Sequence, residues 1–208
     1  MLKTKEVKFS YSKKNQMSFP DLNVKKGESL LVLGESGSGK TTLIQIIAGL
    51  LKPNSGLVEF NGTNYEKLTQ KKLDQFRGRH IGMVFQKPHF VRNISIIENI
   101  MLSLYLSKNK YDEKQIKELL EQVGLKNKAN FLPDQLSQGE QQRSAIALAV
   151  AKRPDMILAD EPTSSLDDSN CYKTIRLLKN QAKSKNAQLI IITHDQRLKD
   201  QFKNSISL

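Results

Sequence analysis

The stretch SLLVLGESGSGKT, residues 29–41, joins a short apolar run to a glycine-rich loop. Residues 29–33 predict a buried strand, and residues 41–51 predict a helix that Pro53 and the turn at residues 54–56 stop. The loop between them matches the pattern G-x-x-x-x-G-K-[ST], in the strand-then-helix context that this pattern requires. The stretch therefore predicts an α/β fold with a phosphate-binding loop at the carboxyl end of a strand.

The residue types of this loop suit phosphate chemistry. Glycines let backbone N–H groups curl around phosphate oxygens, and the amino terminus of the following helix favours an anion. Lys40 can reach the β- and γ-phosphates of a nucleotide, and the Thr41 hydroxyl can ligate Mg²⁺. The alternative is a flexible glycine-rich turn, which the flanking strand and helix argue against. The candidate nucleotide-binding residues here are Gly34, Glu35, Ser36, Gly37, Ser38, Gly39, Lys40, Thr41 and Thr42.

Two further apolar runs, residues 156–159 and 189–193, also predict buried strands that end in polar residues. Residues 169–183 follow with the spacing of an amphipathic helix. Strands with continuous apolar character that alternate with helices are typical of a parallel sheet. The fold class expected is therefore α/β, with a parallel-sheet core.

Two regions depart from that pattern. Residues 7–11 and 57–60 alternate in polarity and flank the turn Asn61-Gly62, so they predict a small antiparallel sheet. Residues 116–123 have amphipathic helical spacing and stop at Gly124. We expect one domain over residues 1–208, with a core of about residues 1–86 and 155–208 and an inserted helical subdomain of about residues 87–154.

Composition limits the class of protein. The 208 residues include 38% hydrophobic and 26% charged side chains, which excludes collagen-like and disordered chains. The single cysteine, Cys171, excludes an internal disulfide, and neither a signal peptide nor a membrane span is expected. The net charge of +12 suits nucleic acid, an anionic membrane or a polyphosphate ligand, or else a plain lysine coat.

Two carboxylates follow the strand at residues 156–159. Asp160 stands at the tip of this strand, where it can hold Mg²⁺. Glu161 is next along the chain and can orient or deprotonate a water in line with a γ-phosphate. Such a pair alone is more often the start of a loop, but the phosphate-binding loop favours a catalytic role.

A third stretch, LSQGEQQR at residues 136–143, resembles the signature sequence of the ATP-binding cassette (ABC) ATPases. Other residues fall in the order of that family's motifs over nearly the whole chain. Gln86 resembles the Q-loop glutamine, Ser164-Ser165-Leu166-Asp167 the D-loop and His194 the switch histidine. Tyr11 stands where the family places an aromatic that stacks on adenine, although it could instead cap the small sheet. Asp167 could likewise serve mainly to shape its turn.

The resemblance implies a P-loop ATPase that works as a dimer around two ATP molecules. Glu161, His194 and Gln86 would be catalytic, and Thr41, Gln86 and Asp160 would hold Mg²⁺. Ser137 and Gly139 would bind the γ-phosphate held by a second subunit, either a copy of this chain or a related ATPase. The family's usual signature is LSGGQ, so Gln138 and Glu140 are departures. Glu140 could repel the nucleotide or contact its ribose, and the sequence leaves both outcomes open.

The same resemblance implies that ATP hydrolysis drives work on a partner molecule. Three kinds compete: a transport permease on a separate chain, a nucleic acid, and a membrane-bound transducer that moves no solute. The spacer between Lys40 and Leu136 lacks the long coiled coil of repair ATPases, and there is one cassette, so no nucleic-acid partner is expected. A position at the cytoplasmic face of the membrane, held through the permease, follows. The net charge then suits anionic inner-leaflet lipid, with the lysine coat as the alternative.

Within the family, residues 79–86 and 96–100 resemble the branch of lipoprotein-release, macrolide-export and cell-division ATPases. This favours export or mechanotransmission, with an importer ATPase as the alternative. We expect the permease to dock between Gln86 and Tyr105. The apolar residues of this segment could form the contact or belong to the core: Phe90, Ile94, Ile96, Ile97 and Met101.

Overall fold

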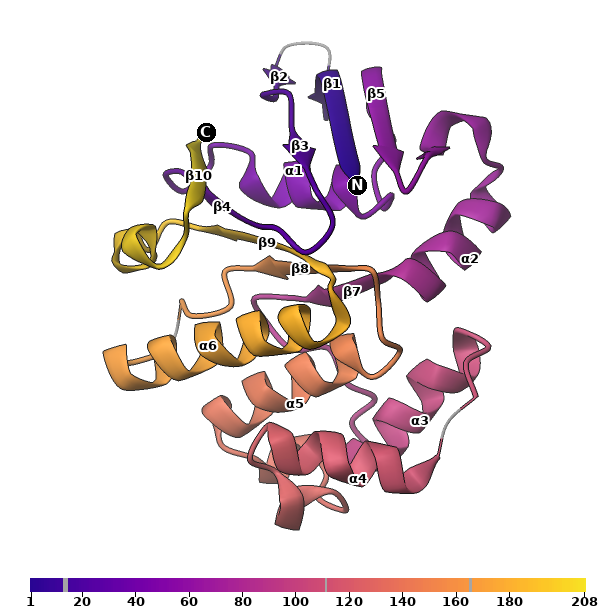
Figure 1. Cartoon of the computed structure of the whole chain (residues 1–208), viewed down its shortest axis with the longest axis vertical. Helices are drawn as coiled ribbons and strands as arrows, with labels where there is room; N and C mark the ends of the chain where they lie inside the picture. Colours follow the sequence, from indigo (N-terminus) through magenta and orange to yellow (C-terminus); the bar gives the residue numbers. More distant parts are fainter. Residues whose placement is uncertain (13–14, 111, 165) are drawn as a thin grey trace.

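A five-stranded parallel sheet forms the centre of the computed structural model, which describes residues 1–12, 15–110, 112–164 and 166–208 (Figure 1). All neighbouring strands of this sheet run parallel. In spatial order the strands are β10 (Asn204–Ser207), β4 (Ser29–Leu33), β9 (Gln188–Thr193), β8 (Met156–Asp160) and β7 (Ile81–Val84). The pairs Leu33 with Thr193 and Asp160 with Ile192 bring the carboxyl ends of β4, β8 and β9 to one edge.

The three strands expected from apolar runs are confirmed, and β7 and β10 were missed. β7 is short and contains Gly82, which packs so tightly that an added Cβ would lie 2.3 Å from the Ala149 carbonyl oxygen. β10 is a partly exposed edge strand of sequence NSIS, which has no apolar run to signal it. Neither strand therefore carries the continuous apolar character that marks a central parallel strand.

Helices cover both faces of this sheet (Figure 1). Alternate strand residues enter different hydrophobic clusters, as the two-residue period of a strand requires. Leu30 and Val32 pack with α1 (Lys40–Ile47), while Leu31 and Leu33 pack with α5 (Gln138–Val150) and α6 (Asp168–Lys185). Because both faces are buried, the strands read as continuous apolar runs in the sequence.

Two helices differ in extent from their predictions. α1 ends at Ile47 and not at Leu51, because Gly49 adopts a left-handed φ of 69° that terminates the helix. α6 covers the predicted stretch and extends it by one residue at its start and two at its end.

The small antiparallel sheet is confirmed and is larger than predicted. Its strands are β1 (Leu2–Ser10), β2 (Gln16–Ser18), β3 (Asn23–Val24), β5 (Ser55–Phe60) and β6 (Thr63–Asn64). Asn61 and Gly62 have φ values of 50° and 76° and make the two-residue turn between β5 and β6. The first hydrophobic cluster joins this sheet to α1 and to one face of the parallel sheet.

A third hydrophobic cluster joins the helices between the parallel strands. It contains residues from α3 (Ile96–Leu106), α4 (Glu113–Gln122) and α5. α4 carries the predicted amphipathic pattern, and Gly124 follows it with a φ of 74°. Ile96 and Ile97 are buried in this cluster, so they belong to the core and are not exposed docking residues.

The remaining elements are one helix and four short 3-10 turns: α2 (Gln70–His80), η1 (Tyr65–Lys67), η2 (Lys126–Lys128), η3 (Pro133–Gln135) and η4 (Gln196–Gln201). None of the described helices is both long enough and apolar enough to cross a bilayer.

Candidate active site

The glycine-rich loop lies between β4 and α1, at the edge where the parallel strands end. Gly37 and Gly39 have φ values of 86° and 93°, which a residue with a side chain rarely adopts. Gly39 also caps α1, and an added Cβ there would lie 3.1 Å from Met17 Sδ and 3.2 Å from Phe19 Cε1. The loop is therefore a backbone cradle that ends on the amino terminus of a helix, which is suited to an anion.

Lys40 lies within this cradle and is buried. Its ammonium donates to the carbonyl oxygens of Gly34 and Glu35 at 2.9 and 2.7 Å. The same nitrogen lies 3.8 Å from Glu161 Oε1. Ser38, also in the loop, has a buried hydroxyl without a hydrogen-bond partner among the described residues. The loop thus holds a fixed cation, while Ser38 lines a smaller hollow together with Gly34 and Leu208.

Thr41 and Asp160 meet across the gap between α1 and β8. The Thr41 hydroxyl donates to Asp160 Oδ1 at 3.4 Å. Burial raises the pKa of Asp160 above its ordinary range, and the hydrogen bond from Thr41 acts in the opposite direction. The pair presents two oxygen donors of the kind that Mg²⁺ prefers.

Glu161 follows β8 with a φ of 47°, an uncommon backbone conformation for a residue with a side chain. Its amide donates to the carbonyl oxygen of Ile192 at 2.9 Å, which holds this conformation against β9. Its carboxylate accepts hydrogen bonds from the Thr193 hydroxyl at 2.8 Å and from the His194 amide at 3.0 Å. His194 Nδ1 lies 2.8 Å from Glu161 Oε1, so the ends of β8 and β9 bring an acid and an imidazole together.

A cavity of about 950 Å³ opens in front of Lys40, Thr41, Glu161 and His194, whereas Gly34, Ser38 and Asp160 do not line it. Tyr11 lies at its rim, largely exposed, with its hydroxyl 3.1 Å from Thr42 Oγ1 and its ring edge-on to Phe9. Gln86 lies just after β7, and its amide donates to the Ser164 hydroxyl at 3.4 Å. The predicted residues that line the cavity are Tyr11, Glu35, Ser36, Gly37, Gly39, Lys40, Thr41, Thr42, Gln86, Glu161 and His194.

The signature residues lie elsewhere. Ser137 caps α5 and is exposed, and Gly139 lines a different hollow, between α5 and α6. Neither residue lines the cavity around Lys40. Asp167 caps α6 by accepting the Asn170 N–H at 2.9 Å, so it does shape its turn. Ser165, which belongs to the predicted D-loop, is outside the described residues.

Some residues at this cavity were not predicted. Thr193 binds Glu161, and the signal for it was a polar residue closing an apolar strand directly before His194. Ser12, Asn15 and Met17 also line the cavity, from either end of the β1–β2 connection. Nothing in the sequence of that connection marked it as part of a site.

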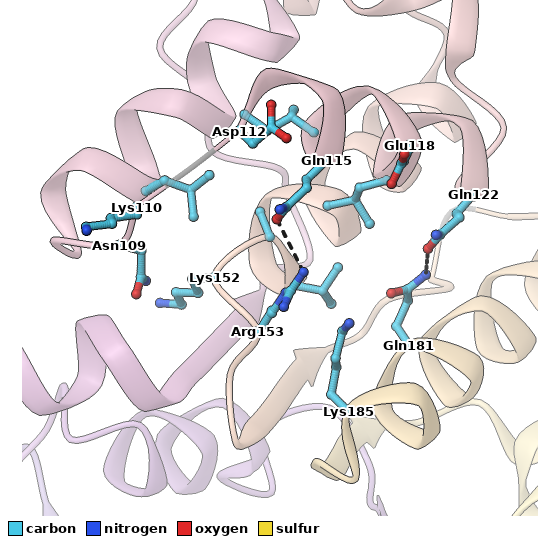
Figure 2. A pocket seen from close by; sticks show the side chains of 15 residues that line it. Asn109, Lys110, Asp112, Gln115, Glu118, Gln122, Lys152, Arg153, Gln181 and Lys185 are labelled. Atoms are coloured by element: carbon cyan, nitrogen blue, oxygen red, sulfur yellow. Dashed lines mark hydrogen bonds between the residues drawn. The ribbon is translucent and has the colours of Figure 1, made fainter.

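Two hollows lie away from this cavity, near the carboxyl end of α3. One is a groove of about 660 Å³ between α2 and α3, with Phe90, Leu102 and Leu106 among its apolar lining. The other, of about 240 Å³, lies between α4 and the carboxyl ends of α5 and α6 (Figure 2). Lys152 lines both.

The residues of the main cavity fit a nucleoside triphosphate with Mg²⁺. The backbone amides of the cradle and the Lys40 ammonium supply donors for phosphate oxygens. Within the described part of the chain, no group of three or more His, Cys, Asp or Glu side chains is placed to hold a metal. Thr41 and Asp160 nevertheless suffice, because Mg²⁺ at such sites takes one or two carboxylates and completes its shell with substrate phosphates and water.

A glycine cradle on a helix amino terminus, fed by a parallel strand and facing an acidic strand end, is the arrangement of the P-loop nucleoside triphosphatases, and the chain falls in that class. Residues 18–164 match the family model described as ABC transporter. The chain belongs to this family and is an ABC-type ATPase subunit.

Relatives place the chain in the branch that contains LolD. The lipoprotein-releasing system ATP-binding protein LolD of Legionella pneumophila (strain Lens) is 41% identical over 180 residues, or 86% of this chain and 79% of that protein. The ABC transporter ATP-binding protein YtrE of Bacillus subtilis (strain 168) is 38% identical over 176 residues, or 84% of this chain and 76% of that protein. The resemblance noted in the sequence is therefore confirmed.

A solved structure confirms the ABC ATPase fold. It is the dimeric, post-hydrolysis state of the ATP-binding cassette MJ0796 bound to ADP and Pi. It is 33% identical to this chain, with a TM-score of 0.90, and the match covers 100% of this chain and 94% of that one.

Proposed function

We propose that this ATPase closes as a dimer around two ATP molecules and so drives a membrane permease carried on a separate chain. The observation that carries the proposal is the separation of the two halves of the site. Lys40, Glu161 and His194 line one cavity, while Ser137 and Gly139 lie outside it. A second subunit can supply the missing half, and the similar cassette MJ0796 is a dimer in its ADP- and Pi-bound structure.

In this proposal the chain binds ATP through the loop and Tyr11. The loop amides and Lys40 hold the β- and γ-phosphates, and the Tyr11 ring stacks on adenine from the rim. Mg²⁺, held by Thr41, Asp160 and Gln86, would neutralise charge on the β- and γ-phosphates. Thr42 keeps the Tyr11 hydroxyl in place through their 3.1 Å hydrogen bond.

Glu161 acts as the general base for hydrolysis. Its carboxylate takes a proton from a water whose oxygen bonds to the γ-phosphorus, as the bond from that phosphorus to the β-phosphate oxygen breaks and ADP leaves. His194 and Thr193 fix the carboxylate through hydrogen bonds of 2.8 Å each. Lys40, 3.8 Å from Glu161 Oε1, joins the base to the phosphate cradle.

Hydrolysis is coupled to the permease through the helical subdomain, for which we propose residues 87–154, inserted into a core of residues 1–86 and 155–208. The groove beside α3 presents exposed apolar side chains, including Leu102 and Leu106, and suits an amphipathic cytoplasmic helix of the permease. A subunit docked in this way is peripheral to the cytoplasmic face of the membrane. The net charge of +12 adds attraction to anionic lipid, and no nucleic-acid partner is proposed.

The direction of work is export or transmission of force across the membrane. Its support is the name of the relative LolD, a lipoprotein-releasing system ATP-binding protein that is 41% identical over 180 residues. An importer ATPase is the alternative, and co-purification of the permease from membranes separates the two.

Glu161→Gln tests the ATPase dimer. The amide cannot take the proton, so hydrolysis falls by about 10²–10⁴-fold while ATP still binds. Light scattering after size exclusion is expected to show a dimer with Mg-ATP and a monomer without nucleotide. Lys40→Ala is the control, because it removes the cradle's cation and should lose ATP affinity in calorimetry. A variant that remains a monomer in ATP and hydrolyses it at the normal rate would contradict the proposal.

A further inference from the structure

Glu140, which stands where the usual signature has glutamine, is tied to the backbone of its own helix. Its Oε2 accepts the Ser137 N–H at 2.9 Å, and Ser137 Oγ accepts the Glu140 N–H at 3.4 Å. This reciprocal pair is a capping box. The Ser137 N–H bond is the main reason that the pKa of Glu140 lies below its ordinary range. The helix that carries Ser137 and Gly139 therefore starts with a full negative charge.

Lys128 supplies the opposite charge. Its ammonium lies 3.6 Å from Glu140 Oε1, which is the only ion pair of Glu140 within the described chain. The same nitrogen lies 4.4 Å from the centroid of the Phe131 ring. Arg143 lies nearer Gly139, where an added Cβ would be 3.5 Å from its Nη1, and it makes no ion pair with Glu140 in the described residues.

The segment that carries Lys128 is held in place by α3. The Ile97 N–H donates to the Ala129 carbonyl at 2.9 Å, and the Ile96 N–H donates to the Phe131 carbonyl at 3.0 Å. These bonds satisfy two amides at the start of α3, which would otherwise lack partners. Lys128 therefore projects from an anchored segment and not from a loose loop.

The charges decide how the helix meets an anion. A helix amino terminus carries about half a positive charge, which attracts phosphate. An ionised Glu140 alone would reverse that sign, and the Lys128 ammonium restores it. The hydrogen bonds also keep the Glu140 carboxylate turned toward its own helix, so neither simple repulsion of the nucleotide nor a ribose contact describes its position.

We propose that Lys128 is a positioning residue for ATP-driven dimer closure: it neutralises Glu140 and holds that carboxylate on the Ser137 amide, so that the signature helix meets the partner's triphosphate as a net donor. This inference rests on the proposed dimer and adds a residue to it. Lys128 acts through Glu140 and touches no nucleotide in its own subunit.

A double-mutant cycle in the Glu161→Gln background tests the inference, since slow hydrolysis keeps ATP constant. Lys128→Met keeps a side chain of similar length that can still pack on the Phe131 ring, but it removes the positive charge. Glu140→Gln keeps the cap, because glutamine also fits a capping box, and removes the opposite charge. The readout is the ATP concentration at which half of the protein is dimeric in sedimentation velocity runs.

We expect Lys128→Met to raise that concentration by on the order of threefold to tenfold, because it leaves an unpaired charge near a triphosphate. The increase should shrink at high salt, and Lys128→Arg should keep the original value. The pair Lys128→Met with Glu140→Gln should return close to the starting value. If Lys128→Met expresses poorly, Lys128→Gln takes its place in the cycle.

An unchanged concentration for Lys128→Met, or an equal increase with and without Glu140→Gln, would overturn the role of Lys128 and leave the ATP dimer standing. A parent that never dimerises in ATP would instead overturn the proposed function, and this inference with it.

Discussion

Lys152 carries an ammonium in a place that water reaches poorly. Burial is the main cause that lowers its pKa to about 8, and the nearby Arg77 cation lowers it further. Figure 2 shows Lys152 among the side chains of the small cavity, with Arg153 and Lys185. Within the described chain it makes no ion pair. A buried cation without a partner opposes folding whenever it is charged.

Lys152→Met is therefore expected to stabilise the protein at pH 7. The pKa of about 8 in the folded protein lies below the ordinary lysine value of 10.5. The loss of folding stability caused by the charged Lys152 is therefore complete below about pH 8 and disappears as the pH rises to 10.5. We expect Lys152→Met to raise the free energy of unfolding by about 1–3 kcal/mol at pH 7, which should appear as a rise of a few degrees in Tm. Calorimetry should show a smaller difference in Tm between the variant and the parent protein at pH 10 than at pH 7.

The matched control is Lys185→Met, since Lys185 is an exposed lysine at the same cavity and its loss should change stability by less than about 0.5 kcal/mol. A lower Tm for Lys152→Met at pH 7, or a difference that does not narrow at pH 10, would contradict the prediction.

Single residues show how far sequence reasoning reaches at the site. The loop from Gly34 to Thr41 could be identified because its spacing is fixed by chemistry, and the structure gathers most of it around one cavity. The left-handed backbone of Glu161 could not be predicted, because a hydrogen bond from its N–H to the Ile192 carbonyl oxygen, on a strand distant in sequence, holds it. The Thr193 contact was missed for the same reason, since it depends on the register of β8 and β9.

At the scale of the element, α3 is fixed by side chains at its start. Ser95 and Glu98 form a capping box, and the buried Asn99 side chain holds the preceding loop. Its Oδ1 accepts the Val91 N–H at 2.8 Å, and its Nδ2 donates to the carbonyls of Val91, Ile94 and Ser95. The loop before α3 borders the groove, and the side-chain amide of Asn99 holds it in place.

Asn99→Ala is expected to destabilise the protein by about 1–3 kcal/mol, because it removes the hydrogen bonds to partly buried backbone groups of the loop and to the buried Ser95 carbonyl. Ser95→Ala removes only a cap and should cost about 1 kcal/mol. Hydrogen exchange should quicken at Val91 in the first variant and stay slow there in the second, with ATP affinity unchanged in both. Equal exchange at Val91 in the two variants would argue against the bracing role of Asn99.

Helices and strands could be predicted where the same burial pattern runs along their whole length. β4, β8 and β9 are covered on both faces and were found, and α4 was found from one apolar stripe. β10 was not predicted because this partly exposed edge strand has no run of apolar residues. α1 was predicted too long because the sequence does not show that Gly49 adopts a left-handed conformation.

At the scale of the whole molecule, several exposed apolar side chains lie in or beside the groove at α3. Leu106 is 70% exposed and Tyr105 72% exposed, and Leu50 and Leu102 are also exposed. Exposed apolar side chains that gather in this way are typical of interaction sites.

We expect Leu102→Glu together with Leu106→Glu to abolish recruitment to membranes that contain the permease, because a carboxylate in the groove cannot be buried against an apolar helix. ATP-dependent dimerisation should persist, since the nucleotide cavity is separate. Tyr172→Glu, an exposed aromatic position on α6 outside the groove, is the control. Flotation with membrane vesicles measures recruitment, and full binding by the double variant would exclude this surface as the docking site.

The backbone of Glu161 sets a limit on how this protein can be improved. A glycine there would adopt the same φ of 47° without strain, but it would leave the Thr193 hydroxyl, the His194 amide and Lys40 without the carboxylate that they contact. Relief of backbone strain and loss of these contacts oppose each other, so a screen for a more heat-resistant motor gains little stability at this position and has to score turnover in every round.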